Sequence, residues 1–472
     1  MEYTPYTLLV DIGLISALLL IGKLIRAYTR TRPVQSLLIP SSITAGILGL
    51  IFGPAVLGWL PFSDQLGTYS TILIAVVFGA MPYSMEFSGR VLKGARAMWS
   101  FSTGMYVMQW GAAVLFGLIV LSFLFDTPDW FGLMLPVGWV GGFGTAAAIG
   151  GSLEDSGQEA AMTLGFTSAT IGTLVAIIGG IIMAKWGAET GRTAQIGDTS
   201  ELPEELRTGL ISIIGQRPAI GHATSSPSSL EPLALHVAVV GMTTIGAYGL
   251  QQGVAALFPE VSIPLFALAF VVGMAGRGIL EITNGKKYVD QDTVSAVSGS
   301  ATDFLVAFGV ASIVPAIVAD YAIPLIILMV FGFVYCFIIF RFVSPAMFGE
   351  QWIERGIFGW GWSTASVATA IALLKIVDPK MKSKTLEEFG VAYVGYSPFE
   401  IGMTIAAPLL IIAGFTWPYA IVVTLGGIAV FVLAFILGWT KNGDEDDEGE
   451  EAEAEESAGG SHASGLPNKP TG

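Results

Sequence analysis

The sequence predicts an all-α polytopic membrane protein with two inverted-topology repeats. Each repeat has five transmembrane helices and a re-entrant hairpin, and one extra C-terminal helix follows them. Apolar segments of about 20 residues, long enough to cross a bilayer as helix, recur along nearly the whole chain. Only 12% of the residues are charged and 53% are hydrophobic, whereas roughly a quarter of the residues in soluble domains are charged. Two segments rich in glycine and threonine lie at matching places in the two halves.

The apolar segments predict full spans from the N-terminus to the start of an acidic tail. The first span contains Asp11 and has neither a basic n-region nor a clear small-residue cleavage site, so we interpret it as a retained span and not a signal peptide. The predicted spans are 7–27, 37–58, 69–86, 97–125, 162–186, 233–257, 262–282, 299–319, 323–343, 391–414 and 418–440.

The two glycine-rich segments, 131–153 and 356–377, are predicted to be hairpins. They contain Gly141-Gly-Phe-Gly-Thr-Ala-Ala-Ala-Ile-Gly-Gly151 and Gly359-Trp-Gly-Trp-Ser-Thr364. Glycine and small hydroxyl residues favour backbone interruptions, and interrupted backbone survives in a bilayer only where protein or a water-filled cavity satisfies its polar groups. A pair of interrupted segments in corresponding halves indicates the binding site of a secondary transporter.

The distribution of basic residues favours hairpins that return to the side from which they start. Basic residues mark cytoplasmic loops, and with both hairpins in place and the N-terminus outside, every basic cluster lies inside. The clusters include Lys23, Arg26, Arg30, Arg32, Arg90, Lys93, Arg96, Lys185, Arg277, Lys286, Lys287, Arg341, Arg355, Lys375 and Lys441. The first hairpin then enters from outside and the second from the cytoplasm.

Short similarities between the halves occur in the same order and support an internal repeat. Gly165-Phe-Thr-Ser-Ala-Thr-Ile-Gly172 resembles Gly395-Tyr-Ser-Pro-Phe-Glu-Ile-Gly402, and Ile39-Pro40 matches Ile263-Pro264. Each half has an odd number of crossings, so the second is inverted relative to the first. The predicted parts are the first repeat (1–186), a cytoplasmic linker (187–231), the second repeat (232–414), an extra span (415–440) and a disordered acidic cytoplasmic tail (441–472).

Composition excludes several other classes of protein. The single cysteine, Cys336, lies in an apolar span, and the three histidines show no metal-ligand spacing. The net charge of −15 owes much to acidic residues crowded between Asp444 and Glu456, which indicate a solvated tail. No phosphate-binding Gly-x-x-x-x-Gly-Lys-Ser/Thr motif and no constellation of nucleophile and base is present. We therefore expect neither an ATP-driven pump nor an enzyme, and no cofactor.

The first hairpin motif, Gly141-Gly-Phe-Gly-Thr-Ala-Ala-Ala148, resembles the GGHGTAAA stretch of sodium/glutamate symporters. The segment from Ala365 to Pro379 is similar to the matching region of that family, and the likeness covers about 7–414. Phe143 departs from the histidine that the family often has at this position. The resemblance implies a homodimer in the cell membrane that moves glutamate with sodium by an elevator-like shift of a transport domain against a scaffold.

Sodium requires oxygen ligands, as other hard cations do, and a substrate carboxylate is suited to helix N-termini at a hairpin tip. The residues expected to bind the substrate are Gly141, Gly142, Gly144, Thr145, Gly359, Gly361, Ser363, Thr364 and Thr369. Those expected to bind sodium are Asp303, Glu400, Thr167, Ser168 and Ser397. The competing interpretation of the small residues is tight helix packing.

Four other polar residues are interpreted as structural. Gln109 is expected to make an interhelical hydrogen bond, Asp11 and His236 to be satisfied locally, and Arg277 to anchor the chain at the cytoplasmic surface. The sequence leaves three alternative functions open. They are a sodium-coupled symporter of di- or tricarboxylates, a cation/proton antiporter that uses Asp303 and Glu400, and a channel.

Overall fold

The computed structural model describes residues 4–28, 39–84, 95–190, 208, 210–211, 215, 217–257, 263–378 and 382–440. All regular structure in these ranges is helical, and ten helices in them are long and apolar enough to cross a membrane. The prediction of an all-α polytopic membrane protein is therefore confirmed. The predicted tail at 441–472, and part of the predicted linker at 187–231, lie outside the described residues.

The elements of the two parts of the chain follow a similar order, except that α14 has no counterpart in the first part. The first half contains α1 (Pro5–Tyr28), α3 (Ser41–Phe52), α4 (Leu66–Ser84), α5 (Arg96–Phe116), η1 (Gly117–Leu121), α6 (Ser122–Phe125), α7 (Met134–Gly138), α8 (Gly142–Asp155) and α9 (Ala161–Glu189). The second contains α11 (Pro232–Leu257), α12 (Leu265–Ile282), α13 (Gln291–Ala311), α14 (Pro315–Asp320), α15 (Ala322–Ile338), η5 (Ile339–Val343), α16 (Ser344–Phe348), α17 (Trp352–Thr364), α18 (Val367–Val377) and α19 (Thr385–Ile412). Helix α20 (Thr416–Ile436) follows as the extra helix.

Two local details recur at corresponding places. Pro40 and Pro264 precede α3 and α12 with nearly the same backbone angles, φ −56° and ψ 141° against φ −59° and ψ 138°. The long helix before each glycine-rich segment contains a π-helical turn, η1 in the first half and η5 in the second. Such turns insert one residue into a helix and are rare. Their occurrence in the helix before each glycine-rich segment therefore adds to the similarity between the two parts of the chain.

Two predicted spans have different boundaries in the structure. Where the sequence predicts a span at 37–58, the described residues 39–58 contain only the short helix α3, which ends at Phe52 with Gly53 as its C-cap before Pro54. The span predicted at 299–319 begins earlier, at Gln291, because the Asp290 side chain caps the helix by accepting from the Thr293 N–H. It ends at Ala311, and Val314 is extended as a residue before proline prefers.

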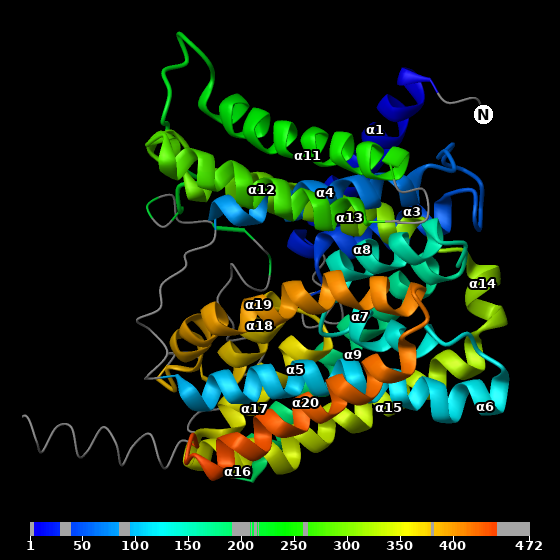
Figure 1. Cartoon of the computed structure of the whole chain (residues 1–472), viewed down its shortest axis with the longest axis vertical. Coiled ribbons are helices and arrows are strands. Elements are labelled where there is room, and N and C mark those ends of the chain that lie inside the picture. Colours follow the sequence, from blue (N-terminus) through cyan, green and yellow to red (C-terminus); the bar gives the residue numbers. More distant parts are fainter. Residues whose placement is uncertain are drawn as a thin grey trace, which may run out of the picture.

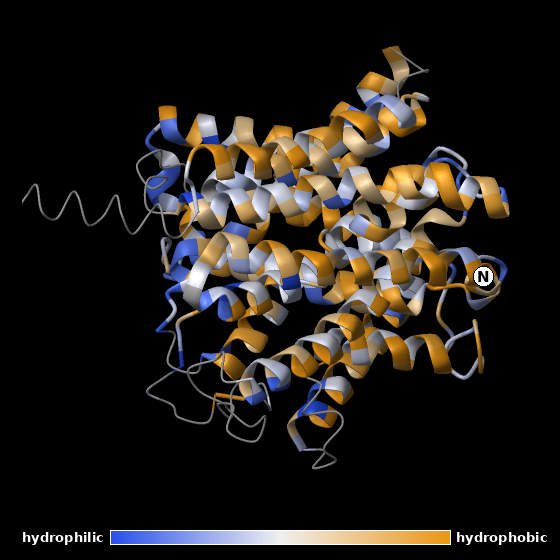
Figure 2. Cartoon of the chain, turned by 90° about the horizontal axis from the view of Figure 1, so that it is seen from below, coloured by the Kyte–Doolittle hydropathy of each residue, from blue (hydrophilic) through white to orange (hydrophobic). Residues whose placement is uncertain are grey.

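The helices lie in two groups (Figure 1). One group, the upper group, contains α1, α3, α4, α11, α12 and α13. The other, the lower group, contains α5, α7, α9, α15, α17, α18, α19 and α20, and α8 packs at the boundary on α4, α13 and α9. Figure 2 shows hydrophobic residues along the helices and hydrophilic residues gathered mainly toward helix ends, the distribution that a bilayer requires.

Candidate functional site

The first interrupted segment breaks between α7 and α8. Gly142 adopts φ +66°, a left-handed conformation that favours glycine. The first four N–H groups of any helix lack intrahelical partners, and within the described residues no side chain caps α8. The Gly141 and Gly142 N–H groups donate to the carbonyl oxygens of Pro136 and Trp139, at 2.8 and 3.1 Å. Among the described residues the next two amides, of Phe143 and Gly144, have no backbone acceptor, and with the positive end of the helix dipole they suit a carboxylate.

The second interrupted segment breaks between α17 and α18 at Ala365, which leaves the helical conformation with φ −150° and ψ −77°, and at Ser366, whose backbone is extended. Here the chain caps itself. Ser366 Oγ accepts from the Thr369 N–H at 3.3 Å and lies 3.1 Å from Thr369 Oγ1. The start of α18 is thus partly satisfied by its own side chain, in contrast to the start of α8.

The two interruptions meet inside the protein. A Cβ atom at Gly142 would lie 3.1 Å from the carbonyl oxygen of Ala365. A Cβ atom at Gly172, on α9, would lie 2.5 Å from the Thr364 carbonyl oxygen and 2.8 Å from Trp139 Cδ1. The N-terminal end of α8 therefore faces the carbonyl end of α17, with α9 beside both.

Gln109, on α5, also reaches this point. Its Nε2 donates to the Ser363 carbonyl oxygen at 3.2 Å and to Cys336 Sγ at 3.4 Å. The expected interhelical hydrogen bond of Gln109 is therefore confirmed. Its Oε1 is buried and has no hydrogen-bond partner among the described residues. Sequence reasoning did not include Gln109 in the site, although a buried amide oxygen without a partner can accept from a donor or coordinate a cation.

The residues predicted to bind substrate fall into two sets. Gly141, Gly142 and Thr145 lie at the start of α8, and Ser363 and Thr364 lie in the last turn of α17. The hydroxyls of Ser363 and Thr364 both donate to the Trp360 carbonyl oxygen, at 3.2 and 2.6 Å, so in this state they serve their own helix.

The other predicted glycines lie where helices approach closely. Cβ atoms at Gly359 and Gly361 would lie 2.5 Å from Phe101 Cε1 and 2.7 Å from Ala370 Cα, respectively. Gly144 faces Ile74 of α4, whose Cδ1 would lie 3.3 Å from its Cβ. Close packing accounts for these three positions without a ligand.

The five residues predicted to bind sodium lie on three helices. Thr167 and Ser168 are on α9, and Thr167 Oγ1 donates to the Thr163 carbonyl oxygen at 2.7 Å. Ser397 and Glu400 are on α19, which packs on α5, α8 and α20. Asp303 is exposed on α13, which packs mainly on α3 and α4. The structure therefore places two of these residues on α9, two on α19, and Asp303 on an exposed position of α13.

Glu400 lies in largely aromatic surroundings. Tyr393 OH donates to its Oε2 at 2.9 Å, and Tyr106 OH lies 3.5 Å from its backbone carbonyl oxygen. The rings of Tyr106, Trp362 and Tyr396 contact one another beside it, which connects α5, α17 and α19. Because Trp362 is near the end of α17, Glu400 is linked through aromatic contacts to the second interruption.

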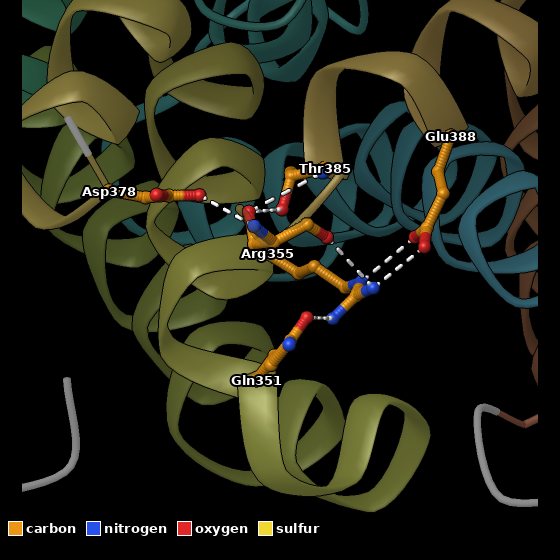
Figure 3. Close-up of polar contacts among 6 residues, drawn as sticks. Gln351, Arg355, Asp378, Thr385 and Glu388 are labelled. Atoms are coloured by element: carbon orange, nitrogen blue, oxygen red, sulfur yellow. Dashed lines mark hydrogen bonds and ion pairs between the residues drawn. The ribbon is translucent and has the colours of Figure 1, made fainter. Parts of the chain in front are cut away.

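A buried ion pair that sequence reasoning missed lies at the base of the second segment (Figure 3). Arg355 is 1% exposed and donates to both carboxylate oxygens of Glu388, at 2.8 and 2.7 Å. It also donates to Gln351 Oε1 at 2.9 Å and to the Ser383 carbonyl oxygen at 3.1 Å. Asp378 accepts from the Ser383 N–H at 2.8 Å. This network fastens the start of α17 to the start of α19, and the only sign of it in the sequence is two opposite charges that flank an apolar segment.

Three polar residues that are interpreted as structural, Asp11, Arg277 and His236, have hydrogen-bond partners within the protein. Asp11 accepts from Tyr69 OH and from the Ser63 N–H, both at 3.0 Å. Arg277 donates to Glu281 Oε1 at 2.9 Å and to the Pro82 carbonyl oxygen at 2.8 Å.

His236 accepts at Nε2 from the Asp290 N–H at 2.8 Å, and its Nδ1 lies 2.6 Å from the Pro232 carbonyl oxygen. A backbone N–H only donates and a carbonyl only accepts, so these bonds fix the neutral Nδ1–H tautomer.

One loop group brings together potential metal ligands that are far apart in sequence. Ligand atoms of His222, Asp290 and Asp292 lie within 4.8 Å of one another. The Asp290 carboxylate, however, accepts from the Thr293 N–H at 2.9 Å and from the His222 N–H at 3.0 Å. Burial opposes its charged form, but these hydrogen bonds prevail and hold the pKa of Asp290 below its usual value. The position of Asp290 in this group is therefore explained by its role as the cap of α13, without a metal ion.

A helical membrane protein in which two interrupted helices meet near its centre has the architecture of a secondary transporter. A family model described as sodium/glutamate symporter matches residues 6–381, and the chain therefore belongs to this family. That family consists of transporters and not of enzymes, and it carries sodium-coupled glutamate symport in general. No curated protein matches the chain at a significant level.

Proposed function

We propose that the protein is a sodium-coupled symporter that imports glutamate or a similar acidic amino acid by an elevator-like alternating-access mechanism. It acts as a homodimer in the cell membrane, with its N-terminus outside and its C-terminus in the cytoplasm. The observation that carries the proposal is the meeting of the α8 N-terminus with the carbonyl end of α17. It supports the proposal because a helix N-terminus is suited to an anion and carbonyl oxygens are suited to a cation.

In this proposal α7–α8 and α17–α18 are re-entrant hairpins of two inverted repeats. The similar order of elements, the paired π-helical turns and the placement of basic residues support that arrangement. The first hairpin enters from outside and the second from the cytoplasm, so each side of the membrane has access to one tip.

The two tips bind different ligands. The start of α8, around Gly141, Gly142 and Thr145, has no side-chain cap, and it holds a substrate carboxylate on the amide groups that follow Gly142, because those of Gly141 and Gly142 already donate to carbonyl oxygens. The carbonyl oxygens that end α17, with Gln109 Oε1 beside them, offer the hard oxygen ligands that sodium prefers. Ser366 already caps the start of α18, which argues against a second anion there.

Further sodium ligands come from the pairs on α9 and α19. Ser168 is buried against the first hairpin, since a Cβ at Gly138 would lie 2.5 Å from its Oγ. Glu400 supplies a carboxylate whose recorded hydrogen-bond partner is a neutral tyrosine. An uncompensated carboxylate at membrane depth is suited to a cation.

Uptake into proteoliposomes with an imposed inward sodium gradient tests the proposal. Glutamate, aspartate, malate and citrate, each labelled, are compared with and without sodium, with potassium as the replacement cation. Sodium-dependent uptake of the amino acids supports the proposal, and preferential uptake of malate or citrate supports a carboxylate symporter instead. Glutamate uptake that ignores sodium overturns it. Proton exchange without any organic anion, followed with an internal pH dye, would indicate an antiporter.

A further inference from the structure

A groove on the surface of the molecule is separate from the site described above. It lies between α9 and α15, has a volume of about 290 Å³, and is lined by α9 from Ile171 to Met183 and by Phe333 and Phe337 of α15. The lining is apolar throughout. The lining side chains contain no polar or charged group that could bind the carboxylates of an acidic solute or a sodium ion.

The second interrupted helix packs directly behind two lining residues of this groove, Gly179 and Phe333. Gly179 has no side chain, and Trp360 of α17 fills the space, since a Cβ at position 179 would lie 2.5 Å from Trp360 Cζ2. Trp360 Nε1 donates to the Ala176 carbonyl oxygen at 3.0 Å, and its ring packs edge-on against Phe333 at 5.5 Å. A molecule in the groove would therefore contact Gly179 and Phe333, the residues against which Trp360 of α17 packs.

The length of the groove matches one leaflet of a bilayer. From Ile171 to Met183, α9 rises about 18 Å at about 1.5 Å per residue. Half of a hydrocarbon core about 30 Å thick is about 15 Å. An acyl chain of a membrane lipid fits both the length and the polarity.

Basic side chains stand at one end of the groove. Lys185 is exposed just beyond Met183, and Arg341, one turn beyond Phe337, places its guanidinium 5.7 Å from the centre of the Trp186 ring. Among the described residues neither has a carboxylate partner, and Glu189, one turn beyond Lys185, forms no ion pair with it. Arg341 belongs to the π-helical turn η5.

We propose that this groove is a binding site for an anionic phospholipid. One acyl chain lies along α9 between Ile171 and Met183, and Lys185 and Arg341 hold the phosphate. Trp186 provides the amphipathic ring that membrane interfaces favour. A bound lipid buttresses Trp360 and so stabilises the position of α17 relative to α9.

Charge argues against a second copy of the chain as the occupant. A dimer axis of a membrane protein runs along the membrane normal, so equal depths of the two copies meet. A dimer through this groove would bring Lys185 and Arg341 toward their own copies. Like charges in an interface are unfavourable, whereas an anionic headgroup neutralises them.

Native mass spectrometry of the purified protein, titrated with dioleoylphosphatidylglycerol or dioleoylphosphatidylcholine, tests the proposal. We expect preferential binding of phosphatidylglycerol. Replacing both basic groups (Lys185→Gln with Arg341→Gln) should weaken it about 25-fold, since each basic residue near an anionic lipid contributes about fivefold in affinity. Filling the groove with Ile178→Trp should weaken binding of both lipids, and Arg341→Lys should retain most of the preference.

Matched controls separate the groove from the general membrane surface. Lys286→Gln removes an exposed basic residue elsewhere, and Val422→Trp enlarges an exposed residue of α20, so both should leave lipid binding unchanged. Inorganic phosphate in excess should not displace the lipid if the acyl chain contributes. Each variant is first checked for native size by gel filtration.

Three results would overturn the lipid site. They are equal binding of the two lipids, unchanged binding in the double variant, and Ile178→Trp separating dimers while lipid binding persists. The last result would assign the groove to an interface between copies. Because lipid binding is measured without transport, its failure is distinguishable from failure of the proposed symport.

Discussion

Gly142 stands where the two interrupted helices meet, and two separate constraints fix its identity. Its φ of +66° is costly for any residue with a Cβ, and a Cβ would also approach the Ala365 carbonyl oxygen to 3.1 Å. The first constraint concerns the local backbone and the second concerns the partner helix. A comparison of glycines can therefore separate strain from contact.

We predict that Gly142→Ala lowers sodium-dependent glutamate uptake by about tenfold or more, since strain and contact together cost about 1–3 kcal/mol. Gly157→Ala is the control, because Gly157 has φ +94° but nothing within 4 Å of a Cβ. It should cost stability without impairing uptake. Equal loss of uptake in both variants would show that backbone strain alone matters at position 142.

Gln109 connects α5 to the end of α17 and leaves one buried oxygen for a ligand. We predict that Gln109→Leu raises the sodium concentration for half-maximal uptake by about tenfold, the effect of losing one or two hydrogen bonds worth about 1 kcal/mol each. Gln109→Glu keeps an acceptor oxygen and should be less impaired. If the leucine variant has normal sodium dependence, the amide serves packing alone.

Asp290 gives a pH-dependent contribution to stability through its cap on α13. Its pKa is lower in the folded protein, so the stabilisation is present above the usual aspartate range and is lost as pH falls through the folded value. We predict that Asp290→Ala lowers stability by about 1 kcal/mol at neutral pH and that the difference shrinks well below pH ~4. Thermal unfolding in detergent measures it, and Asp292→Ala, at an exposed neighbour, should show a smaller effect.

Among the elements, the start of α17 is held to the start of α19 by a buried ion pair. Arg355 and Glu388 are separated by the whole of α18, and burial makes either one costly without the other. We predict that Arg355→Met destabilises the protein by about 3–5 kcal/mol and that adding Glu388→Leu restores most of it. A double-mutant cycle of thermal unfolding checks this, and additive losses would mean that the pair is not coupled.

The elements also show what could be predicted from sequence. Long apolar runs predicted most spans because a helix needs about 20 consecutive apolar residues to cross a bilayer. Hydropathy could not place the start of α13, which depends on a cap by Asp290, and so put Asp303 near a helix end instead of near its middle. The glycine-rich segments identified the interruptions, but not which glycines meet a partner helix. The partners of Gln109 and Arg355 depend on tertiary packing, which no local pattern reports.

At the scale of the whole molecule, the two helix groups make the elevator proposal testable. A Cβ at Gly151 of α8 would lie 2.8 Å from Thr71 Oγ1 of α4, so Gly151→Cys with Thr71→Cys places two thiols across the boundary. We predict that oxidation of this pair blocks uptake and that a reductant restores it. The native Cys336 is buried.

The control pair lies within the upper group. Gly79→Cys with Thr243→Cys joins α4 to α11, where a Cβ at position 79 would lie 3.3 Å from Thr243 Cγ2. Oxidation there should leave uptake unchanged. Uptake that continues with the boundary pair fully oxidised would exclude movement of α8 past α4.

The π-helical turns η1 and η5 have a consequence for how the chain tolerates length changes. Each turn carries one residue more than an α-helix would, so everything after it is rotated by about 100°. Deleting a single residue from η1 or η5 would remove the surplus and swing α6 or α16 to another face of its bundle. Both helices precede an interrupted segment. Such a deletion should therefore shift the interruption that follows, although none of the residues at that interruption is changed.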